Sequence, residues 1–191
     1  KIQGRHNAMN ALAALALVQA AGASLAGPLR VLETYSGEPH RVEHVMTLDG
    51  VDFIDDSKGT NVGAVIAAVS GFSAQGRRVL IVLGGDGKGQ DFAPLGEVLA
   101  GAAGYAALIG RDAEAIGKVL RDVPHERCAT LEEAVEVLWA RRRPGDVLLL
   151  SPACASWDMF RDYAERSRRF VDAAERIRAR ANAEPAGGSA S

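Results

Sequence analysis

Residues 51–61 (VDFIDDSKGTN) join an apolar strand pattern to a run of groups that can do chemistry. After the strand come a carboxylate, a hydroxyl, the ammonium of Lys58, a glycine and the hydroxyl of Thr60. In an α/β sheet such a run lies at the carboxyl end of a strand, which is the edge where ligands bind. The cation, the hydroxyls and the free N–H groups of a helix start suit an anion, either a phosphate or a carboxylate.

Two more loops follow strand-like segments and carry groups of the same kind. Residues 83–88 (LGGDGK) bring glycines, a carboxylate and the ammonium of Lys88, but they lack the spacing of a P-loop. Residues 149–158 place Ser156 as a helix N-cap and Asp158 in the first helical turn. Each loop alone has a purely structural explanation. Together they predict a site for a small dianion, such as an acidic amino acid or a phosphosugar.

A second interpretation of the last loop makes Cys154 a nucleophile. A thiol near a helix start can have a lowered pKa, but it needs a histidine base. No sequence context supports that role for any histidine of the chain, His6, His40, His44 or His125. The two cysteines, Cys128 and Cys154, lie far apart without a metal-type spacing, which fits a reducing cytosol.

Strand-like and helix-like segments alternate from residue 42 onward. Strands are predicted at 42–48, 51–55, 79–84, 105–109 and 147–150, with a short one at 127–129. Helices are predicted at 7–21, 62–72, 94–102, 113–121, 131–140 and 157–181. The first two strands, split by Asp49-Gly50, form a hairpin. The pattern predicts an α/β fold, a doubly wound and mostly parallel sheet with helices on both faces and an antiparallel edge hairpin.

Composition limits the location and the organisation of the protein. The formal net charge of -2 gives no argument for nucleic acid, and no apolar run is long enough to insert into a membrane. No signal peptide opens the chain, so we expect a cytoplasmic protein. The first helix is apolar nearly all round, and we interpret residues 1–35 as the remnant of another domain. A linker at 36–41, a domain at 42–182 and a disordered tail at 183–191 complete the predicted organisation.

Five motifs together resemble the C-terminal part of the Mur ligases. They are, in chain order, residues 4–14 (GRHNAMNALAA), 37–41 (GEPHR), 56–61 (DSKGTN), 83–88 (LGGDGK) and 151–156 (SPACAS). The resemblance runs from Gly4 to about Ile177, and the last motif favours the branch that adds D-glutamate. It implies an ATP-dependent, ADP-producing ligase of peptidoglycan synthesis, which phosphorylates UDP-N-acetylmuramoyl-L-alanine to an acyl phosphate that D-glutamate attacks.

The resemblance also implies a role for individual residues. It implies nucleotide binding by Asn7, Asn10, Arg41 and Asp56. It implies D-glutamate binding by Lys58, Thr60, Lys88 and Ser156, with Tyr163 beside them. It implies catalytic roles for Lys58 and His40. Metal ligands are not expected among these residues, because the family's Mg²⁺ ligands belong to an upstream domain.

The chain alone should therefore be inactive, and we expect a monomer. The family usually has alanine where Gly59 stands, which predicts a looser carboxylate loop. Two alternatives stay open. One is a non-catalytic α/β module that binds a small molecule or a nucleotide, and the other is a sister ligase of the folylpolyglutamate synthase type. Residue types do not reveal a preference for D- over L-glutamate.

Overall fold

The computed structural model describes residues 5–35 and 37–183, which form two compact units divided between Pro39 and His40. The division falls inside the predicted linker at 36–41, whereas the assignment of 1–35 to a separate ATP-binding domain stays a prediction. All but the first residue of the predicted tail at 183–191 lies outside the described residues. No helix in the described part is long and apolar enough to cross a membrane.

The first unit contains two helices, α1 (Arg5–Ala20) and α2 (Ala26–Thr34). The sequence predicted α1 but not α2. Pro28 lies in the first turn of α2, where its missing N–H breaks no helical hydrogen bond. Neither helix has a buried side chain within the described residues. Large apolar side chains are instead exposed at Met9, Leu12, Leu17, Leu29 and Val31.

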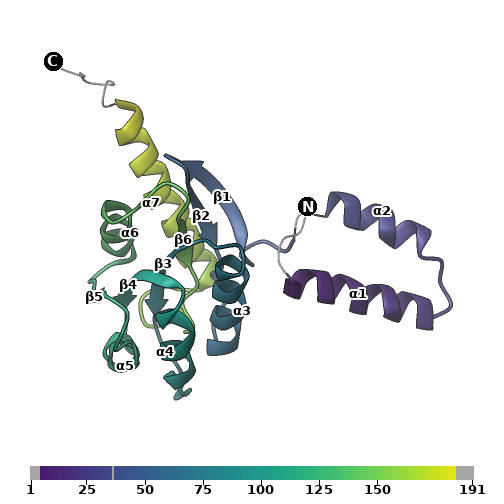
Figure 1. Cartoon of the computed structure of the whole chain (residues 1–191), viewed down its shortest axis with the longest axis horizontal. Coiled ribbons are helices and arrows are strands. Elements are labelled where there is room, and N and C mark those ends of the chain that lie inside the picture. The colour runs from purple at the N-terminus through teal and green to yellow at the C-terminus, as the bar shows by residue number, and fades with distance from the viewer. Residues whose placement is uncertain (1–4, 36, 184–191) are drawn as a thin grey trace. The chain divides into compact units, whose positions relative to one another are not determined.

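The second unit is built on a six-stranded sheet in the order β1-β2-β6-β3-β4-β5 (Figure 1). Its strands are β1 (Glu43–Leu48), β2 (Val51–Asp55), β3 (Val79–Gly84), β4 (Ala103–Ile109), β5 (His125–Arg127) and β6 (Val147–Leu150). β1 and β2 pair antiparallel, and every other pair is parallel. The predicted hairpin forms with positive φ at both Asp49 and Gly50, as tight hairpin turns require.

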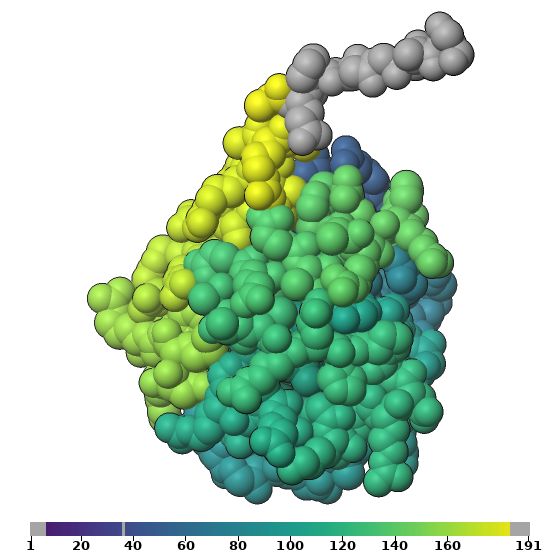
Figure 2. All heavy atoms as spheres, turned by 90° about the vertical axis from the view of Figure 1, so that its left-hand side faces the viewer, coloured from purple at the N-terminus to yellow at the C-terminus, as the bar shows by residue number. Residues whose placement is uncertain are grey.

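Helices cover both faces of this sheet, as predicted. The helices are α3 (Val62–Ser73), α4 (Ala93–Ala100), α5 (Ala113–Val119), α6 (Leu131–Ala140) and α7 (Tyr163–Ala183). The first three contribute to one apolar core and the last two to the other, on opposite sides of the strands. α6 and α7 lie side by side, and the space-filling view shows α7 in yellow beside the green surface (Figure 2).

The central strands are apolar without interruption because both of their faces are covered. In β3, Ile81 and Leu83 enter the core with α3, α4 and α5, while Leu80 and Val82 enter the core with α6 and α7. The same alternation holds along β6. The central strands β3 and β6 therefore contribute only apolar groups to the two cores, and polar groups follow where these strands end.

The last helix starts later than predicted, so the prediction that Ser156 is a helix N-cap is wrong. Residues 157–162 form a turn, in which the N–H groups of Met159 and Phe160 donate to the carbonyl oxygen of Ser156 at 3.1 and 2.8 Å. The helix begins at Tyr163, and the carboxylate of Asp162 accepts the N–H of Glu165 at 2.7 Å. A carboxylate caps a helix at least as well as a hydroxyl, and the helix begins directly after Asp162, the second possible capping residue.

The connections place the three polar loops together. β6 lies between β2 and β3, so the carboxyl ends of the three parallel strands are neighbours. The helices after β2 and β3 cover one face, whereas the helix after β6 covers the other. When the helices that follow two neighbouring strands pack on opposite faces of the sheet, a crevice forms at the carboxyl ends of those strands. Ligands of α/β folds bind in this crevice.

Candidate functional site

The loop after β2 is shaped by local side-chain hydrogen bonds. Asp55 Oδ1 accepts the N–H of Ser57 at 2.9 Å, a bond to residue i+2 that ends the strand in a turn. The N–H of Gly59 then donates to the carbonyl oxygen of Asp56 at 2.7 Å. Asn61 closes the loop as N-cap of α3, because its side chain accepts the N–H of Ala64 at 2.9 Å.

Backbone and side-chain hydrogen bonds join the loops after β2, β3 and β6. The N–H of Ala153 donates to the carbonyl oxygen of Gly59 at 2.9 Å, and Asp86 and Ala155 form an antiparallel bridge. Gln90 accepts the N–H of Val62 at 3.0 Å and donates to the carbonyl oxygen of Ala153 at 2.7 Å. The predicted convergence of the three loops at one sheet edge is therefore confirmed.

The first helical N–H groups of α3 are less open to an anion than we predicted. Val62 donates its N–H to Gln90, and Ala64 donates its N–H to the capping Asn61. No helix follows Ser156 directly, so that residue offers no helix start either. An anion at this edge must be held mainly by side chains.

Two lysine side chains at this edge form no ion pair with a described residue. Lys58 Nζ lies 5.5 Å from the ring centroid of Tyr163, and Lys88 Nζ lies 4.8 Å from that of Trp157. By contrast, Lys118 pairs with an acid of its own helix. Cations that rest on aromatic faces without a carboxylate partner remain available to an incoming anion.

The two predicted hydroxyl groups are also unused. The side chains of Thr60 and the buried Ser156 make no hydrogen bond to a described residue, although both backbones take part in the loop bonds. The structure thus brings Lys58 and Tyr163 together, and Lys88 and Ser156 onto paired loops.

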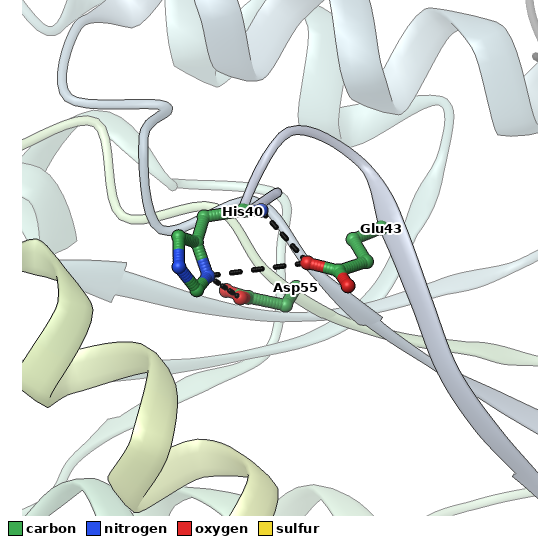
Figure 3. Close-up of side chains that lie close together, drawn as sticks. All are labelled: His40, Glu43 and Asp55. Atoms are coloured by element: carbon green, nitrogen blue, oxygen red, sulfur yellow. Dashed lines mark hydrogen bonds and ion pairs between the residues drawn. The ribbon is translucent and has the colours of Figure 1, made fainter. Parts of the chain in front are cut away.

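His40, Glu43 and Asp55 form a polar cluster at the entry to β1 (Figure 3). His40 Nδ1 lies 2.8 Å from Asp55 Oδ2 and 3.9 Å from Glu43 Oε2. Three such atoms could hold a metal ion, but Mg²⁺ prefers an octahedron of oxygen ligands, and 2.8 Å is the length of a hydrogen bond. The cluster suits Mg²⁺ poorly and is satisfied as a hydrogen-bonded pair of His40 and Asp55.

The backbone next to this cluster is strained. His40 has a φ of 64° and Val42 a φ of 49°, a region that β-branched residues rarely enter. The segment is held by the N–H of Lys58, which donates to the carbonyl oxygen of His40 at 3.0 Å, and by Asp56 Oδ1, which accepts the N–H of Val42 at 3.3 Å. Strain of this kind gathers at functional sites.

The carboxyl group of Asp56 is buried, and burial raises its pKa to about 6. Its Oδ2 accepts the hydroxyl of Ser151 at 2.6 Å, which opposes the rise, as does the positive charge of Arg41. A ribose hydroxyl or a phosphate-bound group would have to share Oδ1, whose bond to Val42 is long at 3.3 Å. The predicted nucleotide contact of Asp56 stays a prediction.

The remaining predicted nucleotide residues make no site by themselves. Arg41 is exposed, and Asn10 is exposed on α1, one helical turn after Asn7. Asn7 and Asn10 belong to the first unit and Arg41 to the second. Their joint role stays a prediction.

The thiol of Cys154 is a poor nucleophile in this fold. It is fully buried, and burial raises its pKa to about 12. The neighbouring carboxylates of Asp112, Asp158 and Asp86 act in the same direction. A catalytic thiol requires a lowered pKa, so the alternative interpretation of this loop is not supported.

Sequence reasoning missed two residues of α7 that build the site. Arg166 is fully buried on α7 and donates to the carbonyl oxygens of Ser57 at 2.8 Å and Cys154 at 3.1 Å. Ser167 donates its hydroxyl to Asp55 Oδ2 at 2.6 Å. The one available signal was their helical spacing. Arg166 and Ser167 lie four and three residues before Phe170 and seven residues before Ala173 and Ala174, which places them on the buried face of α7.

An open surface depression lies farther along the same sheet edge. It is lined by Gly110, Arg111, Arg127, Cys128, Ala129, Asp158 and Met159, at the ends of β4 and β5. None of the predicted ligand residues lines it.

The sequence matches a known protein family over residues 40–154, described as "Mur ligase, glutamate ligase domain". It is 54% identical over 179 residues to the UDP-N-acetylmuramoylalanine--D-glutamate ligase of Burkholderia mallei (strain SAVP1). That alignment covers 93% of this chain but 35% of the relative, so the chain spans about a third of the length of the curated relatives it matches.

Solved structures share the fold at low sequence identity. The MurF ligase of Thermotoga maritima in complex with ADP has a TM-score of 0.66 at 19% identity, covering 92% of this chain and 39% of that one. The folylpolyglutamate synthase of Mycobacterium tuberculosis, complexed with ADP and AMPPCP, has a TM-score of 0.69 at 18% identity, covering 88% of this chain and 41% of that one. Both establish the fold alone.

Proposed function

The chain belongs to the Mur ligase family, and we propose that it is the amino-acid-binding part of an ATP-dependent D-glutamate ligase. In this proposal, a longer protein phosphorylates the carboxylate of UDP-N-acetylmuramoyl-L-alanine, and the amine of D-glutamate displaces the phosphate to form an amide. The 54% identity to a ligase of that name supports the choice of substrates. The structural observation that carries the proposal is the presence of two lysines, Lys58 and Lys88, around the carboxyl end of β6, neither of which forms an ion pair with a described residue.

D-Glutamate brings two carboxylates, and the site offers two separate sets of donors. Lys58 and Thr60 belong to the loop after β2, whereas Lys88 and Ser156 belong to the paired loops after β3 and β6. We assign one carboxylate to each set, with the ring of Tyr163 as the wall beside Lys58. Positioning of the amine against a short-lived acyl phosphate then supplies much of the rate.

The nucleotide is assigned to the other side of the loop after β2. Asn7 and Asn10 would face the adenine, while Arg41 and Asp56 would contact the ribose and the phosphates. The described residues offer no oxygen-rich octahedral set for Mg²⁺, so its ligands are assigned to the additional length of the relatives. The same additional residues would cover the exposed apolar side chains of α1 and α2.

The first test is a phosphate-release assay on the full-length protein with UDP-N-acetylmuramoyl-L-alanine, ATP and each glutamate enantiomer. Phosphate release that depends on D-glutamate is expected. Absence of phosphate release with D-glutamate overturns the proposal and favours a non-catalytic binding module. Release with a folate substrate and L-glutamate instead would move the protein to the folylpolyglutamate branch.

Replacement of Lys58 by methionine tests the binding site within the same assay. A charge-assisted hydrogen bond contributes about 1.5–3 kcal/mol, so Lys58→Met should raise the KM for D-glutamate by about 10- to 100-fold. Lys118→Met is the matched control, because Lys118 is an exposed lysine paired with Glu114 on α5. Equal KM values for the two variants would remove Lys58 from the site.

A further inference from the structure

The carboxylate of Asp55 is buried and surrounded by hydrogen-bond donors from three elements. It is 1% exposed. Its Oδ1 accepts the backbone N–H of Ser57 at 2.9 Å, and its Oδ2 accepts the hydroxyl of Ser167 from α7 at 2.6 Å. The same Oδ2 lies 2.8 Å from His40 Nδ1 (Figure 3). These contacts fix the carboxylate in one orientation.

This arrangement selects one tautomer of His40. An ionised carboxylate only accepts hydrogen bonds, so the ring nitrogen that faces it must carry the proton. When the imidazole is neutral, the proton therefore sits on Nδ1, and Nε2 keeps its lone pair. Nε2 makes no hydrogen bond to a described residue, and the side chain is 27% exposed. A proton acceptor thus points away from the buried pair.

His40 is also placed beside the proposed amino-acid site. Its ring meets the ring of Tyr163 edge to face at a centroid distance of 5.8 Å, and Lys58 Nζ lies over that same ring. The backbone of Lys58 is bonded to the carbonyl oxygen of His40 at 3.0 Å. A ligand carboxylate on Lys58 therefore brings its own ammonium group into the neighbourhood of His40.

We propose that His40 Nε2 takes the proton from the ammonium group of the incoming amino acid, and that Asp55, held by Ser167, is the positioning residue that keeps the single proton of the neutral imidazole on Nδ1. This inference rests on the proposed ligase function. The step is needed because an ammonium nitrogen has no lone pair and cannot attack a carbonyl carbon.

The atoms and charges of the step balance. His40 Nε2 takes one proton, and the freed amine attacks the acyl carbon of the acyl phosphate. The C–N bond forms, the C–O bond to phosphate breaks, and the second proton of the nitrogen leaves with the phosphate. The imidazolium then returns its proton to solvent.

The tautomer can be measured on the chain itself by ¹⁵N NMR of labelled histidine, with His40→Asn assigning the signals. In the unsubstituted chain, the neutral form of His40 should carry its proton on Nδ1 and not on Nε2. In Asp55→Asn, the amide oxygen must stay against the N–H of Ser57, since a backbone N–H cannot accept. The amide nitrogen then faces His40 Nδ1, and the proton should move to Nε2.

Asp52→Asn is the matched control for this measurement. Asp52 lies on the same strand and 3.5 Å from a different histidine, His44, so its loss should leave the tautomer of His40 unchanged. A neutral His40 with its proton on Nε2 in the unsubstituted chain overturns the proposal, even if the Asp55 variant fails to fold.

The catalytic role is tested in the full-length ligase by comparing two nucleophiles. Hydroxylamine is neutral at assay pH and captures an acyl phosphate without a base, whereas glutamate arrives as an ammonium. His40→Asn and Asp55→Asn should each lower D-glutamate-dependent phosphate release by at least about 100-fold and leave hydroxamate formation nearly unchanged. Asparagine suits position 40 because it tolerates the positive φ found there.

The outcomes separate this proposal from the function on which it rests. An equal loss with both nucleophiles places the defect in acyl phosphate formation and overturns the role as proton acceptor. Full D-glutamate activity in either variant also overturns it. Absence of hydroxamate and of D-glutamate-dependent phosphate release in the unsubstituted ligase instead overturns the ligase function itself.

Discussion

Asp56→Asn should stabilise the folded chain at neutral and alkaline pH. The carboxyl group of Asp56 is 5% exposed, and burial raises its pKa from an ordinary 3.8 to about 6. The folded state therefore binds a proton more tightly than the unfolded state, and stability falls as the pH rises from about 4 to about 6. Asparagine has no proton to lose in this range, so the variant should lack this part of the pH dependence.

The magnitude follows from the two pKa values. Their separation, at about 1.4 kcal/mol per pKa unit, corresponds to roughly 3 kcal/mol of lost stability once the pH is well above about 6. Asparagine can keep both present contacts, because its oxygen can accept the N–H of Val42 and the hydroxyl of Ser151 can turn to accept from its amide nitrogen. Hydrogen bonding should therefore change little.

Urea unfolding at a series of pH values measures the difference between the variant and the unsubstituted chain. The difference matters because other carboxylates make stability fall toward acid pH in both proteins. Against the effect of burial, hydrogen bonds with Thr47 and Arg77 lower the pKa of Asp52, and a hydrogen bond with Arg169 lowers the pKa of Glu132. Asp122→Asn, at an exposed turn position, controls for the loss of one negative charge.

The expected result is equal stability of variant and parent near pH 4 and an advantage of up to about 3 kcal/mol for Asp56→Asn near pH 8. An advantage of the same size at both pH values, or none at either, would refute the reasoning, because burial of an ionised carboxylate would then not be the cause. The same advantage in Asp122→Asn would point to net charge instead.

Three further predictions concern the packing around the site. The structure reverses the expectation that alanine, the usual residue of the family at position 59, would tighten the loop: Gly59→Ala should disturb the bonds of Asp56, since an added Cβ would lie 2.3 Å from its Oδ2 and 2.9 Å from its carbonyl oxygen. Thermal unfolding should show a loss of about 1–3 kcal/mol, and an unchanged midpoint would contradict this. Arg166→Met should lower the free energy of unfolding by about 2–4 kcal/mol, because the carbonyl oxygens of Ser57 and Cys154 lose their buried donor. Urea titration measures this free energy, and an unchanged value would contradict the prediction. The Cys154 thiol, with its pKa raised to about 12, should not react with iodoacetamide at neutral pH until the chain unfolds. Mass spectrometry measures the labelling, and rapid labelling of the native protein would support the interpretation of Cys154 as a nucleophile.

The strands of the sheet were the most predictable part of the fold. β2, β3 and β6 have the predicted boundaries. β3 and β6 are covered on both faces and therefore read as uninterrupted apolar runs that polar or glycine residues end abruptly. The helix Leu131–Ala140 was also predicted correctly, since Thr130 caps it by accepting the N–H of Glu133 at 3.1 Å. Local chemistry decides both features.

The start of the last helix could not be predicted, because the sequence offers two possible capping residues. Ser156 and Asp162 are both acceptable capping residues. In the structure the turn between them is tied to the loop after β4, because Asp158 Oδ2 accepts the N–H of Arg111 at 2.7 Å, and the helix starts after Asp162. The burial of Arg166 could not be predicted either, because an arginine-rich helix is expected to be exposed to solvent. The two carbonyl groups to which its guanidinium donates come from distant loops. Tertiary partners decide both outcomes.

Asp55 and Asp56 illustrate why neighbouring identical residues can have opposite physical roles. Side chains alternate across a strand, so Asp55 faces α7 and three donors, whereas Asp56 faces the loop after β6 and loses most of its hydration. The three donors hold the Asp55 carboxylate in one orientation so that it can orient His40, while the desolvated carboxylate of Asp56 destabilises the fold when it is ionised. Such a destabilising group persists in a chain when an incoming ligand supplies the missing interactions. If Asp56 contacts the nucleotide as proposed, saturating ATP added to the full-length protein should reduce the stability advantage of Asp56→Asn at alkaline pH. An undiminished advantage would argue that Asp56 does not contact the nucleotide.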